Sequence, residues 1–386
     1  MNTQEPGQKI TVKQLLMVMV KKDASDIYIT ADAPPTYRIN GVVYPLKQPP
    51  LNGVQCEQLA NSIMSEKQRA QFSETYEMNL ALSYPDLGRF RVNIFRQRGN
   101  VGMVIRQIKT QIPTLDELGL PEVFKDVSMS KRGLVIMVGA TGSGKSTSLA
   151  AMIDWRNSNQ AGHIITIEDP IEFVHPHKKC VVTQREVGTD TLEYEAALKN
   201  TLRQAPDVIL IGEIRDRETM EHALEFAETG HLCLSTLHAN NANQALERVV
   251  NFFPQEMHDQ VVLNLALNLR AILSQRLVRT TDGKRTAAIE IMINTPRISD
   301  LIMKDEISEI KEAMAEGKQY GMQTFDQHLL QLWKEGRITE EEALRHADAL
   351  NDLRLKIKMA KLEQGEASDS GQIDQIIGDD ADELKI

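Results

Sequence analysis

The sequence predicts an α/β protein with two domains, a small mixed domain followed by a larger one built on a parallel sheet. Three observations predict it. Before residue 108, strand-like segments surround an Asn40-Gly41 turn; after Val123, apolar runs alternate with helical segments; and a glycine-rich loop joins one of those runs to a helix. The 386 residues are ample for two domains, each with its own core.

Residues 1–108 are predicted to form the small domain. Thr11 and Gln14 have the spacing of a capping box, and the apolar residues after them share one helical face. Further elements are expected as follows: strands over 25–30, 78–83, 88–97 and 101–108, a hairpin over 37–44, and an amphipathic helix over 56–72. Residues 109–121 contain two prolines and few apolar pairs, which favours a linker.

Residues 122–362 are predicted to form the larger domain, with helices on both faces of its parallel sheet. Its strand candidates are the apolar runs 134–138, 164–167, 208–212 and 232–235, and residues 257–360 have a mostly helical pattern. From residue 363 to 386 the chain carries eight acidic residues against one lysine, with Gly and Ser between them. Such a composition buries too little apolar surface to order itself, so we expect a disordered acidic tail.

The composition argues against several classes of protein. A net charge of -10 argues against a protein whose main ligand is a nucleic-acid backbone. Three widely spaced cysteines (Cys56, Cys180 and Cys233) form neither a disulfide framework nor a zinc site, which suits a reducing cytoplasm. Neither a signal peptide nor an apolar run of membrane-spanning length is apparent, so we expect membrane contact to be peripheral.

A phosphate-binding loop is the strongest motif in the chain. The pattern G-x-x-x-x-G-K-[ST] is matched by Gly139, Ala140, Thr141, Gly142, Ser143, Gly144, Lys145 and Ser146. The apolar run 134–138 enters it and a helical segment from Thr147 leaves it, so loop and helix N–H groups converge on phosphate oxygens. We expect Lys145 to reach the β- and γ-phosphates of a nucleotide, and Ser146 to bind Mg²⁺.

Two acidic clusters each follow an apolar strand candidate. One runs from Glu168 to Phe173 and includes Asp169 and Glu172; the other contains Glu213 and Asp216. The carboxyl ends of parallel strands face the ligand crevice, so these carboxylates are candidates for contact with Mg²⁺ or with a water in line with the γ-phosphate. Pro170 is expected to turn the chain so that Glu172 projects, while solvated loop ends are the alternative interpretation.

Three segments of the chain resemble the motifs of a known family. Residues 202–216 resemble the signature of the type II secretion and type IV pilus ATPases, 168–173 resemble their Asp box, and 231–240 their His box. The resemblance covers about residues 13–302. A short N-terminal domain without a tetracysteine module is similar to the pilus-retraction branch, and implies a PAS-like domain followed by a RecA-like P-loop NTPase domain with a helical C-terminal part.

The resemblance also implies roles for particular residues. ATP and Mg²⁺ would be held by the P-loop through Thr147, with Ser146, Glu213 and Asp169 near the metal. Glu172 would be the general base, Glu213 the acid of a Walker B segment, and His231 and His238 would sense the γ-phosphate. Arg91, Arg96 and Arg98 are candidates to act on the nucleotide of a neighbouring subunit, which implies a homohexamer; a solvated edge strand would look similar.

The implied function is a cytoplasmic hexameric ATPase that drives type IV pilus retraction and twitching motility. It would act at the inner-membrane base of the pilus, on a platform protein, without direct nucleic-acid binding. Three alternatives stay open: a type IV secretion ATPase, a hexameric helicase, and a non-catalytic nucleotide-binding adaptor.

One helix departs from the family pattern. Where retraction motors carry two arginines after a Glu-Ile-x-x strand, this chain has Ser299 and Met303. This helix and the acidic tail suggest that the protein works with a companion retraction ATPase, with the helix and tail serving contact or regulation. A solvated tail and neutral change in the helix are the alternative.

Overall fold

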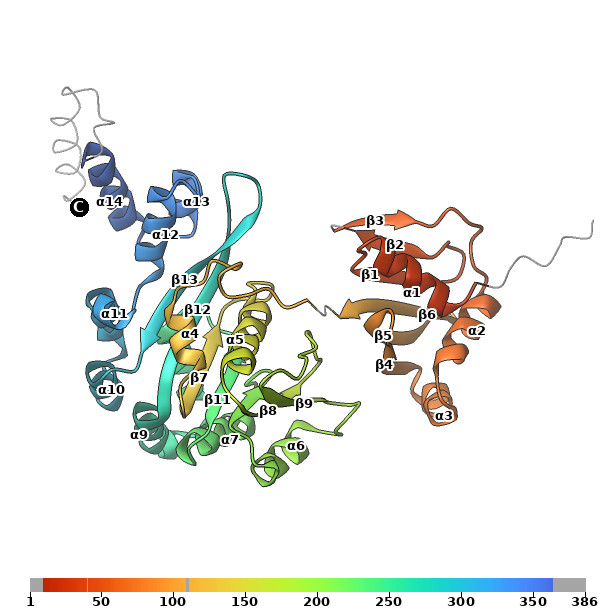
Figure 1. The fold of residues 1–386 in the computed structure, drawn as a ribbon, viewed down its shortest axis with the longest axis horizontal. Coiled ribbons are helices and arrows are strands. Elements are labelled where there is room, and N and C mark those ends of the chain that lie inside the picture. The colour runs from red at the N-terminus through yellow and green to blue at the C-terminus, as the bar shows by residue number, and fades with distance from the viewer. Residues whose placement is uncertain (1–9, 40, 109–110, 364–386) are drawn as a thin grey trace, which may run out of the picture. The chain divides into compact units, whose positions relative to one another are not determined.

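The computed structural model describes residues 10–39, 41–108 and 111–363 (Figure 1). Its strands form a six-stranded sheet, in the order β3-β2-β1-β6-β5-β4, and a seven-stranded sheet, in the order β13-β12-β7-β11-β10-β8-β9. Packing divides the described chain into two compact units. One joins the residues up to Thr114 with Leu149–Ile214, and the other joins Leu115–Ser148 with the residues from Arg215.

The six-stranded sheet is antiparallel at every strand pair. Its strands are β1 (Asp26–Ile29), β2 (Thr36–Ile39), β3 (Val42–Pro45), β4 (Glu77–Tyr84), β5 (Gly88–Gln97) and β6 (Asn100–Ile108). All of the strands expected in this region are therefore confirmed, as is the hairpin, although Asn40 at its turn lies outside the described residues. Apolar side chains of the sheet and of α1 (Val12–Lys21) share one core, and the capping box at Thr11 is present.

The single helix expected over 56–72 is two helices, α2 (Gly53–Ile63) and α3 (Glu66–Thr75). Ser65 is extended and begins the second helix, because its side chain accepts the amide of Gln68 while the Gln68 side chain accepts the amide of Ser65. This capping box restarts the helix after Met64, whose backbone is also extended.

The seven-stranded sheet contains the predicted parallel strands. They are β7 (Gly133–Val138), β8 (Gly162–Glu168), β10 (Val208–Ile211) and β11 (Leu232–Leu237), joined by β9 (Cys180–Glu186), β12 (Leu269–Arg279) and β13 (Arg285–Ile293). β7 pairs in parallel with β11 and β12, and β8 with β10 and β9. Every residue of β7, β10 and β11 is buried, as continuous apolar runs in parallel sheets require.

The mostly helical pattern expected over 257–360 missed a long antiparallel hairpin of β12 and β13, drawn in teal in Figure 1. Leu269–Arg279 mixes Ser, Gln and Arg with apolar residues, so its alternation is weak in the sequence, and the strand is set by pairing with β7 and β13.

Helices flank this sheet within their own units. They are α4 (Val123–Ser128), α5 (Lys145–Asn159), α6 (Tyr194–Thr201), α7 (Arg217–Glu228), α8 (Ala242–Asn251), α9 (His258–Asn268), α10 (Pro296–Met303), α11 (Ile310–Glu316), α12 (Phe325–Lys334), α13 (Glu340–Arg345) and α14 (Leu350–Glu363), with 3₁₀ turns between some of them. α7 packs on β7 and β11, and α12 packs on β13. α12, α13 and α14 share a separate core with β12 and β13.

Other expectations stay predictions. The domain limits at 108, 121 and 362 are not settled by the packing units, and the acidic tail beyond Glu363 lies outside the described residues. Among the described helices, none is both long and apolar enough to cross a bilayer.

Candidate nucleotide site

The glycine-rich loop connects β7 to α5, the predicted strand–loop–helix context. Gly144 has a φ of +89°, which side-chain-bearing residues rarely adopt. Gly139 and Gly144 also lie against one residue of β12: a Cβ at Gly139 would come within 2.5 Å of the Gln275 carbonyl oxygen, and one at Gly144 within 2.7 Å of Gln275 Nε2. The loop therefore needs glycine at both ends because β12 supports it closely from behind.

Lys145 is the first residue of α5 and is only 8% exposed. Its ammonium donates hydrogen bonds to the carbonyl oxygens of Gly139, at 2.6 Å, and of Ala140, at 3.0 Å. The charge is thus held across the loop by acceptors that a phosphate could replace, since charge-assisted hydrogen bonds to phosphate are the stronger interaction.

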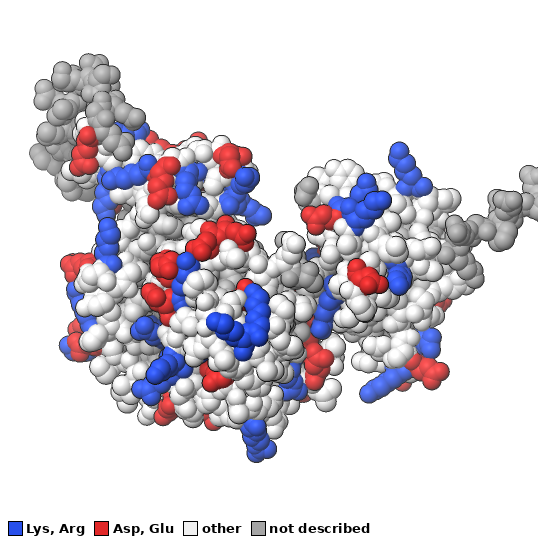
Figure 2. Space-filling model, in the orientation of Figure 1, with Lys and Arg blue, Asp and Glu red and all other residues white. Residues whose placement is uncertain are grey.

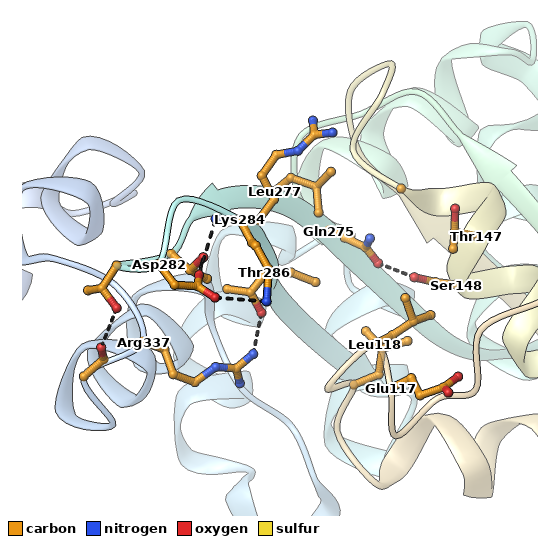
Figure 3. Close-up of a pocket in the computed structure, with 17 residues that line it drawn as sticks. Glu117, Leu118, Thr147, Ser148, Gln275, Leu277, Asp282, Lys284, Thr286 and Arg337 are labelled. Atoms are coloured by element: carbon orange, nitrogen blue, oxygen red, sulfur yellow. Dashed lines mark hydrogen bonds and ion pairs between the residues drawn. The ribbon is translucent and has the colours of Figure 1, made fainter. Parts of the chain in front are cut away.

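Two cavities adjoin the loop. One of about 370 Å³ lies along residues 139–143 and is also lined by Asn240, Arg276, Arg285 and His346. The other, of about 790 Å³, runs past Gly144 and Thr147 (Figure 3). Its apolar lining includes Leu118, Leu120 and Leu277. Its charged lining includes Glu117, Lys284 and Arg337. Both volumes lie in the range of small-ligand sites.

Sequence reasoning missed the contribution of β12. Arg276 lies 3.9 Å from the ring centroid of Phe325, pairs with Asp348 at 2.7 Å, and donates to the His346 carbonyl oxygen at 2.9 Å. It therefore ties the β12 strand to the C-terminal helices. No motif in a single sequence marks either Gln275 or Arg276, because their roles depend on the strand that was not predicted.

Glu213 lies beside the first acidic cluster within the other unit, whereas Asp216 of the second cluster belongs to the unit that contains the P-loop. The Gly212 amide donates to the Ile167 carbonyl oxygen at 2.8 Å, which extends the parallel pairing of β10 with β8 by one step. Glu213 follows directly, so the structure brings it beside the segment that carries Glu168, Asp169 and Glu172. Their contact with Mg²⁺ or with an attacking water stays a prediction.

The loop after β8 is held by its backbone. The Ile171 amide donates to Glu186 Oε2 at 3.2 Å, and the Glu172 amide hydrogen-bonds the Glu168 carboxylate. Burial raises the pKa of Glu168, although hydrogen bonds from Thr166 and Gln184 oppose the rise. The Glu172 side chain is itself exposed. Glu172 thus combines a fixed backbone with an exposed carboxylate, as a residue that contacts a ligand or water requires. Glu168 instead stabilises the loop by accepting a backbone hydrogen bond.

The His box is divided by its strand, which corrects the expectation for His231. Its carbonyl oxygen accepts the Gly133 amide at 3.0 Å, so it lies at the start of β7, the edge opposite the P-loop. His238 follows Leu237, which pairs with Val138, the last residue before the loop. Six strand residues span roughly 20 Å, so the two histidines cannot share one phosphate. Only His238 remains a candidate there.

The predicted arginines sit on β5 and the turn after it. Arg91 lies on β5 opposite Arg106 of β6, and Arg98 is in the turn with a φ of +49°. Arg96 pairs with Glu57 at 3.5 Å and stacks over Phe72 and Tyr76. Arg96 is thus engaged by its own α2 and α3, whereas the described residues give Arg91 and Arg98 no ion pair.

Comparison with known proteins settles the family. The model of the type II/IV secretion system protein family matches residues 2–345. The chain belongs to this family. It is 59% identical to the type IV pilus ATPase PilU of Pseudomonas aeruginosa PAO1 over 348 residues, covering 90% of this chain and 91% of PilU. It is 46% identical to the PilT retraction ATPase of the same organism, covering 87% of this chain and 98% of PilT.

A solved structure of the pilus retraction motor PilT with bound ADP has a TM-score of 0.84 and 41% identity to the chain, and covers 90% of this chain and 99% of that one. The resemblance to the retraction branch of the family, and the P-loop fold that it implied, are confirmed.

Proposed function

We propose that this chain is an ATPase motor of type IV pilus retraction. The observation that carries the proposal is the P-loop itself, with Lys145 lying across it and glycines where β12 leaves no room for side chains. The similarity to PilU and PilT supports the assignment to pilus retraction, since the names of these proteins assign them to type IV pili and to retraction.

In this proposal the residues of the chain divide the work. Lys145 exchanges its two carbonyl partners for the β- and γ-phosphates, and the N–H groups of the loop through Thr147 bind the phosphate oxygens. The cavity past Thr147, with its apolar wall of Leu118, Leu120 and Leu277, accepts the nucleoside.

Hydrolysis is assigned to the paired acidic clusters. Glu172 orients a water and takes its proton, and His238 contacts the γ-phosphate side. Ser146, Glu213 and Asp169 present hydroxyl and carboxylate oxygens, the donors that Mg²⁺ prefers, so the donor set fits this ion. When bound, Mg²⁺ neutralises charge on the phosphate oxygens.

The working assembly is proposed to be a homohexamer in the cytoplasm, at the inner-membrane base of the pilus and in contact with its platform protein. Arg91 or Arg98 reaches the nucleotide of the neighbouring subunit. A companion PilT-like ATPase is a further proposed partner, supported by the occurrence of PilU and PilT in one organism. Figure 2 shows basic and acidic side chains interspersed over the visible face of the described residues, which favours protein partners over nucleic acid.

Replacing the loop lysine tests the proposal. Lys145→Ala removes one charge from a loop and no core packing, so the protein should fold as before and lose ATP hydrolysis. Lys131→Ala, at an exposed lysine before β7, is the matched control and should hydrolyse ATP at the parental rate. Parental hydrolysis by the Lys145→Ala protein would remove the site from consideration.

A further inference from the structure

Gln275 of β12 is a buried amide whose two ends are both bound to the P-loop region. It is 3% exposed. Its Oε1 accepts a hydrogen bond from Ser148 Oγ of α5 at 2.7 Å, and its Nε2 donates to the backbone carbonyl oxygen of Ser143 at 2.8 Å (Figure 3 draws the first of these). One side chain thus bridges the loop and the helix that follows it.

The orientation of this amide is fixed by its partners. A backbone carbonyl oxygen can only accept, so the amide must present Nε2 to Ser143 and Oε1 to the Ser148 hydroxyl. Register places the residue there: Ser274 pairs with Val138, the last residue of β7, so Gln275 follows at the level where the loop begins.

The bond to Ser143 has a consequence for the other side of the loop. In a planar trans peptide, the carbonyl and the next N–H point in opposite directions. Because the Ser143 carbonyl is drawn toward Gln275, the Gly144 amide is directed away from β12. A P-loop binds phosphate through backbone N–H groups that point toward the same anion, so the direction of the Gly144 amide matters for binding.

We propose that Gln275 is a positioning residue for nucleotide binding: it holds the Ser143–Gly144 peptide in the orientation that binds phosphate, and Ser148 holds Gln275. The inference rests on the proposed function, because it assigns a phosphate to this loop. Gln275 also lines both cavities beside the loop, but the proposed role acts through the Ser143–Gly144 peptide.

Three variants test it, with ADP and Mg²⁺ as the ligand. Gln275→Met keeps length and volume but removes both hydrogen bonds, so the peptide is free to rotate. We expect its Kd for ADP to rise about tenfold, the worth of one to two hydrogen bonds. Ser148→Ala removes only the support of Gln275 and should raise the Kd by about threefold. The double variant should be no weaker than Gln275→Met, because both changes act through one contact.

The matched control is Gln323→Met. Gln323 Nε2 likewise donates to a backbone carbonyl oxygen, that of Ile289 at 2.9 Å, but Gln323 does not line either cavity beside the loop. Both Met variants should lose thermal stability without nucleotide, Gln275→Met more because it loses two hydrogen bonds and Gln323→Met one, whereas only Gln275→Met should lose ADP affinity. At saturating ATP, Gln275→Met should retain a larger fraction of kcat than of kcat/KM.

Several results would overturn the assignment. One is an ADP Kd for Gln275→Met within twofold of the parent; another is an equal loss of affinity in Gln323→Met. If Gln275→Met does not fold, Ser148→Ala decides, and an unchanged Kd for that variant rejects the role. Failure of the nucleotide site itself is recognised separately, because Lys145→Ala would then hydrolyse ATP normally.

Discussion

The Gly212 amide and the Ile167 carbonyl oxygen lie 2.8 Å apart, and this hydrogen bond sets Glu213 beside the loop that carries Glu172. The contact is close on every side. A Cβ at Gly212 would come within 3.1 Å of the Tyr194 hydroxyl, 3.2 Å of Glu168 Cα and 3.3 Å of the Ile167 carbonyl oxygen. Two of these atoms belong to backbone, so neither can move away without moving the acidic loop.

Gly212→Ala should therefore reduce ATP turnover, by about tenfold, because a shift of a few tenths of an ångström displaces both acidic clusters. ADP affinity should fall less. Combining it with Tyr194→Phe removes the closest of the three contacts and should recover part of the activity. Steady-state kinetics with ADP titrations check both points, and full turnover by the single variant contradicts this account of the contact.

Glu172→Gln should bind ATP and fail to hydrolyse it, since an amide still hydrogen-bonds water but accepts a proton poorly. The expected loss in kcat is about 100-fold or more, the usual contribution of a general base. Glu193→Gln, at an exposed glutamate before α6, is the control and should keep full activity. If both variants turn over ATP equally, water activation belongs to another residue.

Mixed rings test the arginines. A chain carrying Arg91→Ala or Arg98→Ala is inactive in this scheme because it cannot serve its neighbour, and a Lys145→Ala chain is inactive because its own loop fails. Mixing the two should restore some ATPase activity, because certain interfaces then contain two intact halves. Arg96→Ala, which loses its contacts to α2 and α3, should instead lower the thermal stability of the unmixed protein. Verified mixed rings with no recovery at any ratio would place the whole site within one chain.

Acidification should destabilise the protein through buried histidines. Burial lowers the pKa of His328 to about 4 and that of His175 to about 4, and the Nδ1 atom of His328 accepts the Ile289 amide at 2.9 Å, which requires a neutral ring. An unfolded histidine has a pKa of about 6.5. Between these values the unfolded chain binds more protons, so stability falls as the pH drops from about 6.5 toward about 4.

The His328→Gln variant keeps an acceptor for Ile289 but does not titrate. Its free energy of unfolding should therefore fall less steeply with decreasing pH, by a difference on the order of 3 kcal/mol below a pH of about 4, and its melting temperature should follow. His222→Gln, on α7, controls for the loss of one histidine. Parallel melting profiles for the parent and His328→Gln would show that protonation of this ring does not govern the acid response.

The parts of the site that depend on patterns within a short stretch of sequence could be predicted. β7 and β10 are apolar runs, β11 begins with one before Ser235, and the P-loop has a fixed spacing, so each was recognisable without a structure. Parallel strands then predicted that Glu172 and Glu213 follow carboxyl strand ends at one edge of the sheet, and the structure adds that the two strands are neighbours. The features that were not predicted depend on long-range pairing. The sequence of β12 does not indicate a strand by itself, and its strand conformation depends on pairing with β7 and β13. Gln275 and Arg276 reach their partners only because of the register of this pairing. His231 was expected near the γ-phosphate because it is close to His238 in the sequence. The strand between the two histidines instead separates them by its full length.

Gln275 and Arg276 are consecutive on β12, so their side chains leave opposite faces of the strand. One holds the phosphate-binding loop and the other holds Phe325 and Asp348 at the C-terminal helices. The phosphate-binding loop and the C-terminal helices are therefore anchored to two adjacent residues of one strand, with no loop between the two anchors.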